Sequence, residues 1–158
     1  MQIFLKKLTV LSLILFLSAC GFQLRGDIQA NFDSISITGG SPSFNKTLQR
    51  KFRQAGISIE NAAQAEKVVE IIKNNFTKTI LSLTGTGAVS EYQLDYEVTY
   101  RFKNQNTPWN DPITIEANRT FTYDDAYILA KDEEEKRLVS GMEDQLIKTM
   151  ATQLSLSK

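Results

Sequence analysis

The sequence predicts an α+β fold in which two helices pack on one face of a mostly antiparallel four-stranded sheet, as a two-layer sandwich. The clearest observation is the strict apolar–polar alternation over Tyr92–Phe102, because a strand with one buried and one wet face has a period of two. Two apolar stripes with helical spacing flank the strands, one over 44–52 and one over 139–154. The predicted order is a strand, a helix, a short extended piece, three long strands in a meander, and a final helix.

The first part of the predicted domain contains one strand and one helix. Ser34–Thr38 alternates between apolar and polar residues, which predicts a strand that ends at a Gly39-Gly40 turn. Ser41 suits the N-cap of the following helix, with Pro42 at the first helical position. Gly56 suits the left-handed residue that closes this helix. The apolar stripe of the helix consists of Phe44, Leu48 and Phe52.

Three long strands are predicted to follow. The first covers Val68–Leu83 and has an irregular middle, the second is the alternating segment, and the third covers Ile113–Tyr123. Gly85-Thr86-Gly87 joins the first two as a hairpin turn, because a phosphate-binding loop would lead into a helix rather than a strand. Arg119 interrupts the apolar face of the third strand, and we expect it to snorkel or to pair.

The last helix is predicted to begin after Asp124 or Asp125, either of which can cap it. Its first half contains the charge run Lys131–Arg137, which we expect to be solvated and held by local ion pairs. Its second half has an apolar stripe for the core, made of Val139, Met142, Leu146, Met150 and Leu154.

Composition excludes several classes of protein. The chain has 158 residues with 18 basic and 18 acidic side chains, so its neutral balance argues against a nucleic-acid binder. The absence of histidine excludes Ser-His-Asp and Cys-His catalysis, and the single cysteine excludes an intramolecular disulfide. Adjacent Glu133–Glu135 point in different directions on a helix and form no carboxylate pair. We therefore predict no enzymatic activity, no cofactor and no metal site.

The amino terminus is predicted to be a targeting segment. Lys6 and Lys7 precede an apolar run over 8–17, which is about half of the ~20 residues that span a bilayer. The segment Leu17-Ser18-Ala19-Cys20 that follows resembles the lipobox of bacterial lipoproteins, in which the cysteine is acylated. A plain secreted protein with a stray cysteine is the alternative. The predicted organisation is a lipoprotein signal peptide over 1–19, a lipidated tether over 20–33 and one α+β domain over 34–158.

Three segments resemble the lipopolysaccharide-assembly lipoprotein family LptE. They are Cys20–Gly26 (CGFQLRG), Gly87–Leu94 (GAVSEYQL) and Ala126–Asp132 (AYILAKD), the last of which follows the Arg119-x-Phe121 strand. The segments occur in the order of the family and extend over nearly the whole mature chain. The resemblance implies an α+β fold that agrees with the one derived above.

The resemblance also implies a role. It implies an outer-membrane lipoprotein on the periplasmic side, and Gly21 in place of an aspartate after the cysteine agrees with outer-membrane sorting. Such a protein plugs the β-barrel LptD one-to-one, helps it assemble, and assists lipopolysaccharide transport to the outer leaflet. The implied partners are LptD, lipopolysaccharide and the membrane through the lipid anchor. The alternative is a generic lipid-anchored scaffold or pilot protein of another outer-membrane assembly machine.

In the family, basic side chains near the strand loop and at the start of the last helix meet lipopolysaccharide phosphates. The resemblance places Lys131 at the helix-start position. The strand loop Leu83–Ser90 departs from the family pattern because it contains no Lys or Arg. Lys78, earlier in the strand, is the candidate that compensates, and Lys136 and Arg137 are further candidates.

Overall fold

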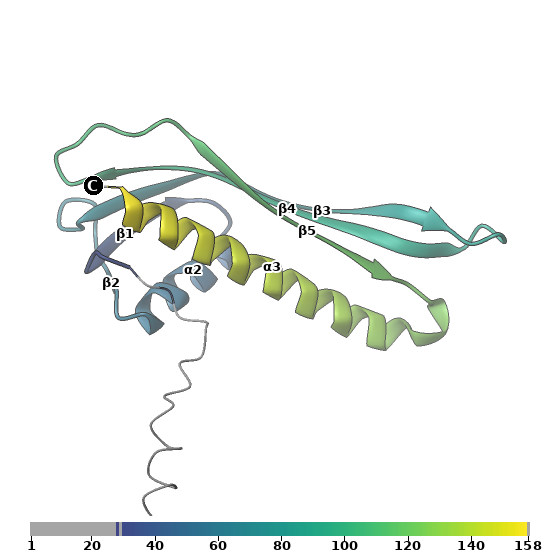
Figure 1. The fold of residues 1–158 in the computed structure, drawn as a ribbon. Helices are drawn as coiled ribbons and strands as arrows, with labels where there is room; N and C mark the ends of the chain where they lie inside the picture. The colour runs from purple at the N-terminus through teal and green to yellow at the C-terminus, as the bar shows by residue number, and fades with distance from the viewer. Residues whose placement is uncertain (1–27, 29, 158) are drawn as a thin grey trace, which may run out of the picture.

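A long open sheet with both helices on one of its faces forms the fold (Figure 1). The structure is a computed structural model, and it describes residue 28 and residues 30–157. The elements in chain order are β1 (Ser34–Gly39), α2 (Pro42–Gln54), β2 (Ser58–Ile59), β3 (Lys67–Leu83), β4 (Val89–Asn104), β5 (Ile113–Thr122), the 3-10 helix η1 (Asp125–Tyr127) and α3 (Ile128–Leu156).

The sheet has five strands in the order β2-β1-β3-β4-β5, so the predicted class is confirmed and the predicted count of four is wrong. β3, β4 and β5 form the expected antiparallel meander, whereas β1 runs parallel to both β2 and β3. The fifth strand is β2, whose two residues pair with Ser34 and Ile35. Helix α2 carries the chain back to the end where β1 began, and the next strands therefore run parallel to β1.

The local signals around α2 are confirmed. The Oγ atom of Ser41 accepts a hydrogen bond from the backbone N–H of Phe44 at 3.3 Å, and Pro42 occupies the first helical position. Gly56 has a φ of 84°, the left-handed conformation that favours glycine after a helix. The stripe of Phe44, Leu48 and Phe52 is buried. Just before β1, Phe32 is buried against the ring of Phe52, with centroids 6.2 Å apart.

The meander presents one apolar face to the helices, as the alternation predicts. On β4 the buried residues are Leu94, Tyr96, Val98, Tyr100 and Phe102, and β5 adds Ile115, Ala117 and Phe121. The irregular middle of β3 corresponds to register shifts at Ile71/Lys73 and beyond Ile80. Gly85-Thr86-Gly87 lies in the hairpin turn, which closes with a 2.8 Å bond from Thr84 N–H to the carbonyl of Ala88.

Helix α3 contains both the charge run and the apolar stripe, as predicted, but its cap differs from the prediction. Asp124 caps the short η1 turn, accepting from Ala126 N–H at 2.9 Å, and α3 starts only afterwards. Met142, Leu146, Met150 and Leu154 are buried. Arg119 pairs, as expected, because its guanidinium donates to Gln145 of α3 at 2.7 Å. Within the described part of the chain, no helix is long and apolar enough to cross a membrane.

The two halves of α3 differ in their surroundings. α2 lies beside the second half, where Lys51 bonds Asp144 at 2.9 Å. α2 does not extend beneath the far half of the sheet, where the β3–β4 hairpin and β5 continue past it above the first half of α3 (Figure 1). Among the residues that the structure describes, one side of that half of α3 therefore has no neighbouring helix.

We expect the fold to lose stability between pH 10 and pH 12 through Tyr96. Its hydroxyl donates to Glu143 at 3.0 Å and accepts from Asn74 at 3.1 Å, and burial raises its pKa to about 12. Because the folded pKa lies above that of the unfolded chain, the stabilisation is complete below pH 10 and is lost as the pH rises through the folded pKa. After solvent screening we expect a loss of about 1–2 kcal/mol, measured by urea unfolding at each pH. Tyr96→Phe should make this part of the profile less steep, while buried Tyr100, whose pKa is also raised by burial, keeps part of the slope, and an unchanged slope would contradict the assignment.

Candidate functional site

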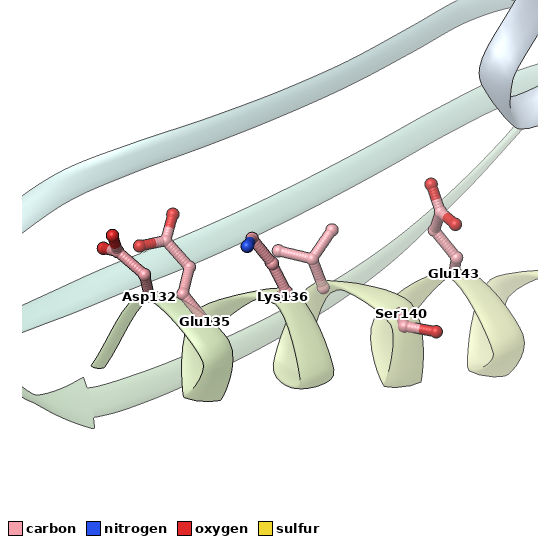
Figure 2. A pocket seen from close by; sticks show the side chains of 6 residues that line it. Asp132, Glu135, Lys136, Ser140 and Glu143 are labelled. Atoms are coloured by element: carbon pink, nitrogen blue, oxygen red, sulfur yellow. The ribbon is translucent and has the colours of Figure 1, made fainter. Parts of the chain in front are cut away.

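A groove runs along the first half of α3, beneath the far half of the sheet. The groove has a volume of about 370 Å³. The residues of α3 that line it are Asp132, Glu135, Lys136, Val139, Ser140 and Glu143. The charged side chains rise from α3 towards the strands (Figure 2). On the strand side, Phe76 packs edge-on against Tyr96 with ring centroids 5.9 Å apart. Phe76 remains 39% exposed and Ile80 56%, and both pair with inward residues of β4, so they are exposed apolar side chains on the face of the sheet that carries the helices.

Lys78 is held inside an aromatic and acidic environment. Its ammonium lies 2.5 Å from a Glu135 oxygen and 4.1 Å from the ring centroid of Tyr92. The rings of Phe121 and Tyr123 follow at 5.6 and 5.9 Å. An ammonium over aromatic faces is attracted by their quadrupoles. Lys78 therefore ties β3, β4 and β5 to α3, and its charge is already neutralised.

Lys131 lies one helical turn before Glu135 on α3, next to the end of β5. Its ammonium bonds Glu134 at 2.9 Å and reaches the hydroxyl of Thr122 at 3.4 Å. Only 17% of its side chain is exposed. A phosphate that binds Lys131 must therefore compete with Glu134 for the ammonium.

Lys136 and Arg137 both interact with Glu133. Lys136 bonds its carboxylate at 2.7 Å, and the Arg137 Nε donates to its carbonyl oxygen at 3.2 Å. The hydrogen bond raises the pKa of Lys136 and lowers that of Glu133, but both groups are exposed to solvent. This pair is therefore a weak surface interaction.

The four basic candidates do not converge on one site. The adjacent residues Glu133, Glu134 and Glu135 point in three directions, as predicted, and each binds a different lysine. Lys78 and Lys136 approach the groove, whereas Lys131 faces the β5 side. The described residues contain no group of three His, Cys, Asp or Glu side chains that could hold a metal ion.

Sequence reasoning missed the environment of Lys78. The strand register is the feature that reveals this environment. Lys78 of β3 pairs with Leu94 of β4, so its side chain lies on the inward face of the sheet. Tyr92 of β4 and its partner Phe121 of β5 lie on the same face. An inward lysine beside two inward aromatic residues indicates a cation–π cluster once this register is known.

A second, smaller hollow of about 300 Å³ lies at the opposite end of α3. There Lys67 is buried, and its ammonium donates to the carbonyl and hydroxyl oxygens of Ser157 at 2.7 and 3.0 Å. Burial lowers the pKa of Lys67 even though Glu66 is nearby. This lysine satisfies the carbonyl of Ser157 directly after the end of the helix, which is a structural role.

Comparison with known proteins identifies the family. The model of LptE, described as lipopolysaccharide-assembly, matches residues 30–154. The chain belongs to the LptE family. The predicted family is thus confirmed, and two of the three resembling segments, Gly87–Leu94 and Ala126–Asp132, lie within the matched residues, whereas Cys20–Gly26 lies outside them. No curated protein sequence matches the chain significantly.

Solved structures agree with this assignment. The NMR structure of uncharacterized lipoprotein B from Nitrosomonas europaea is 28% identical, with a TM-score of 0.70 over 85% of this chain and 90% of that one. Rare lipoprotein B from Shewanella oneidensis is 25% identical, with a TM-score of 0.64 over 77% of this chain and 96% of that one. A minor lipoprotein from Acinetobacter baumannii is 20% identical, with a TM-score of 0.62 over 80% of this chain and 93% of that one, and shows the fold alone.

Proposed function

We propose that this LptE-family protein plugs the LptD β-barrel in the outer membrane, one-to-one, and helps the barrel assemble and deliver lipopolysaccharide to the outer leaflet. It does so from the periplasmic side, anchored by lipid on Cys20, which lies outside the described residues. The protein acts by binding, without turnover and without a cofactor. The observation that supports a plug, beyond family membership, is the polar face of the sheet opposite the helices.

This face is polar along β4 and β5. On β4 it presents Glu91, Gln93, Asp95, Glu97, Thr99 and Arg101, and on β5 Thr114, Glu116, Asn118 and Thr120. Its side chains pair with one another, for example Lys73 with Glu97 at 2.9 Å and Arg101 with Glu70 at 2.5 Å. The lumen of a large outer-membrane barrel is polar. A face with satisfied polar groups fits such a lumen without burying unpaired charges.

Depletion of the protein tests this function in cells. Without it, we expect LptD to accumulate in a misassembled form and lipopolysaccharide to be lost from the cell surface. Normal LptD assembly during depletion would contradict the proposal. It would favour the alternative, a lipid-anchored scaffold or pilot protein of another outer-membrane machine.

We place the lipopolysaccharide contact at Lys131, at the start of α3. It is the basic candidate on the β5 side, whereas Lys78 is enclosed by aromatic rings and Glu135. Lys136 and Arg137 lie further along α3 and share Glu133. A phosphate that binds here forms one ion pair with the Lys131 ammonium and must displace the Glu134 carboxylate from it. The contact should therefore be weak and sensitive to salt.

Lys131→Glu should weaken lipopolysaccharide binding about tenfold at low salt, because it removes one attraction and adds one repulsion of about 0.5–1 kcal/mol each. The difference should shrink at high salt, where ions screen the phosphates. Binding is measured by titration of the purified protein with lipopolysaccharide. Lys136→Glu, with the same charge change on the other side of the helix, is the matched control. Wild-type binding by Lys131→Glu would show that this residue is only part of the surface.

A further inference from the structure

The far half of β3 has an unpaired edge. β1 pairs with β3 only as far as Ile71, where Gly40 N–H donates to the Ile71 carbonyl at 3.1 Å and the chain turns into α2. From Lys73 to Ile80, β3 pairs with β4 alone among the described residues. An unpaired strand edge is a template for another strand.

The pairing pattern identifies the backbone groups on this edge. On the β5 side the Phe102 carbonyl accepts from Asn110 N–H, the Phe102 N–H donates to the Asn110 side-chain oxygen, and the Ser90 carbonyl accepts from Tyr123 N–H. The even-numbered residues of β4 therefore direct their backbone groups towards β5. The odd-numbered residues therefore bond to β3, and by register their partners are Lys73, Asn75, Thr77 and Thr79. The alternate residues of β3 direct their N–H and C=O groups to the open edge, and these residues are Asn74, Phe76, Lys78 and Ile80.

The same four residues direct their side chains towards the helix layer, because they pair with the inward residues of β4. Two of them have polar partners: Asn74 bonds the Tyr96 hydroxyl, and Lys78 bonds Glu135. The other two, Phe76 and Ile80, are large, apolar and exposed, on the face of the sheet towards the helices. The edge thus combines free backbone groups with an apolar surface beside a hollow.

The wall of the groove carries a negative excess. Glu135 is neutralised by Lys78, and Lys136 bonds Glu133. Asp132 and Glu143 remain, and neither forms an ion pair within the described part of the chain. A ligand with basic residues near its apolar ones complements this wall.

We propose that the Lys73–Ile80 edge of β3 binds an extended segment of a partner polypeptide as an added strand. The alternate side chains of this segment are apolar residues that cover Phe76 and Ile80, flanked by basic residues that face Asp132 and Glu143. Backbone pairing supplies affinity and the groove supplies selectivity, as in other cases of strand addition. Register shifts bound the segment on both sides and leave a regular ladder between them.

The probe is the acetylated and amidated peptide KTVTVTK, whose lysines and valines share one face of a strand. It is added at millimolar concentration to the full chain, and amide hydrogen exchange is followed by NMR. We expect the amides of Phe76, Lys78 and Ile80 to exchange about tenfold more slowly, because they gain partners. The amides of Thr77 and Thr79 already bond β4 and should not change. Absence of slowing at the three edge amides would overturn the proposal.

Two controls separate strand addition from other binding. Phe76→Lys should abolish the slowing, whereas Thr77→Lys adds the same charge on the opposite face and should retain it. A peptide N-methylated only at the valines and one N-methylated only at the threonines should differ in binding. Only one of these two sets of amides faces β3 and donates hydrogen bonds to it. Equal binding by both peptides would mean that only the apolar groove is used, and would overturn the proposal. Concentration-dependent protection of the edge without peptide would identify a second copy of the chain as the occupant, which also overturns it.

Discussion

Val98→Asp is expected to lower the free energy of unfolding by about 3–5 kcal/mol, because it places a carboxylate without a partner in the core. Val98 is fully buried and lies on β4 between Asn74 and Ile115 of the neighbouring strands. Domains are stable by about 5–15 kcal/mol, so this loss removes a large share of the stability. Urea unfolding monitored by circular dichroism measures the effect.

Thr99→Asp is the matched control for this prediction. Thr99 is the next residue of the same strand, but its side chain lies on the polar face, next to Thr114 at 2.9 Å and opposite Lys73. The same carboxylate should change stability there by less than about 0.5 kcal/mol. Equal unfolding midpoints for Val98→Asp and the wild type would show that the inward face of β4 has been assigned wrongly.

Cys20→Ala is expected to abolish acylation and to block lipoprotein processing, so that the full-length precursor accumulates. The cysteine thiol is the attachment point of the lipid in the predicted lipobox, and alanine has no nucleophile. Each buried CH₂ of an acyl chain contributes about 0.8 kcal/mol, so loss of the acyl chains removes the anchor. Metabolic labelling with a palmitate analogue, followed by gel analysis of the purified protein, measures the effect.

Gly21→Ala is the control for this variant, because it leaves the thiol in place and should keep the label. Retention of the label by Cys20→Ala would contradict the lipoprotein assignment of this cysteine. The protein would then fit the plain secreted form with a stray cysteine.

Elements with a strong local signal were predictable from the sequence. The alternation of β4, the capping of α2 by Ser41 and the stripe of α3 each depend on spacing within one segment, and each is confirmed. The short extended piece that becomes β2 was predicted, but its place in the sheet was not, since two residues give no periodicity and only pairing with β1 makes them a strand. The η1 turn was missed for a similar reason, because an aspartate cap looks the same before a 3-10 turn and before an α-helix.

The candidate site was predictable only in part. Helical spacing predicts that Lys131 and Lys136 diverge, and their separate carboxylate partners confirm this. The ring cluster around Lys78 depends on the register of three strands, which the sequence does not specify on its own. The open edge of β3 depends on where β1 ends and α2 turns away, a tertiary feature that has no local signal.

We propose that the protein works as the plug of the LptD barrel. This role is tested by purification of the tagged full chain from outer membranes, with mass spectrometry and quantified stoichiometry of the proteins that come with it. We expect LptD in a one-to-one ratio, with a complex that persists in Lys131→Glu because that residue lies outside the strand core. Recovery of the folded chain without LptD, or with a different barrel in its place, would show that the protein is not this plug.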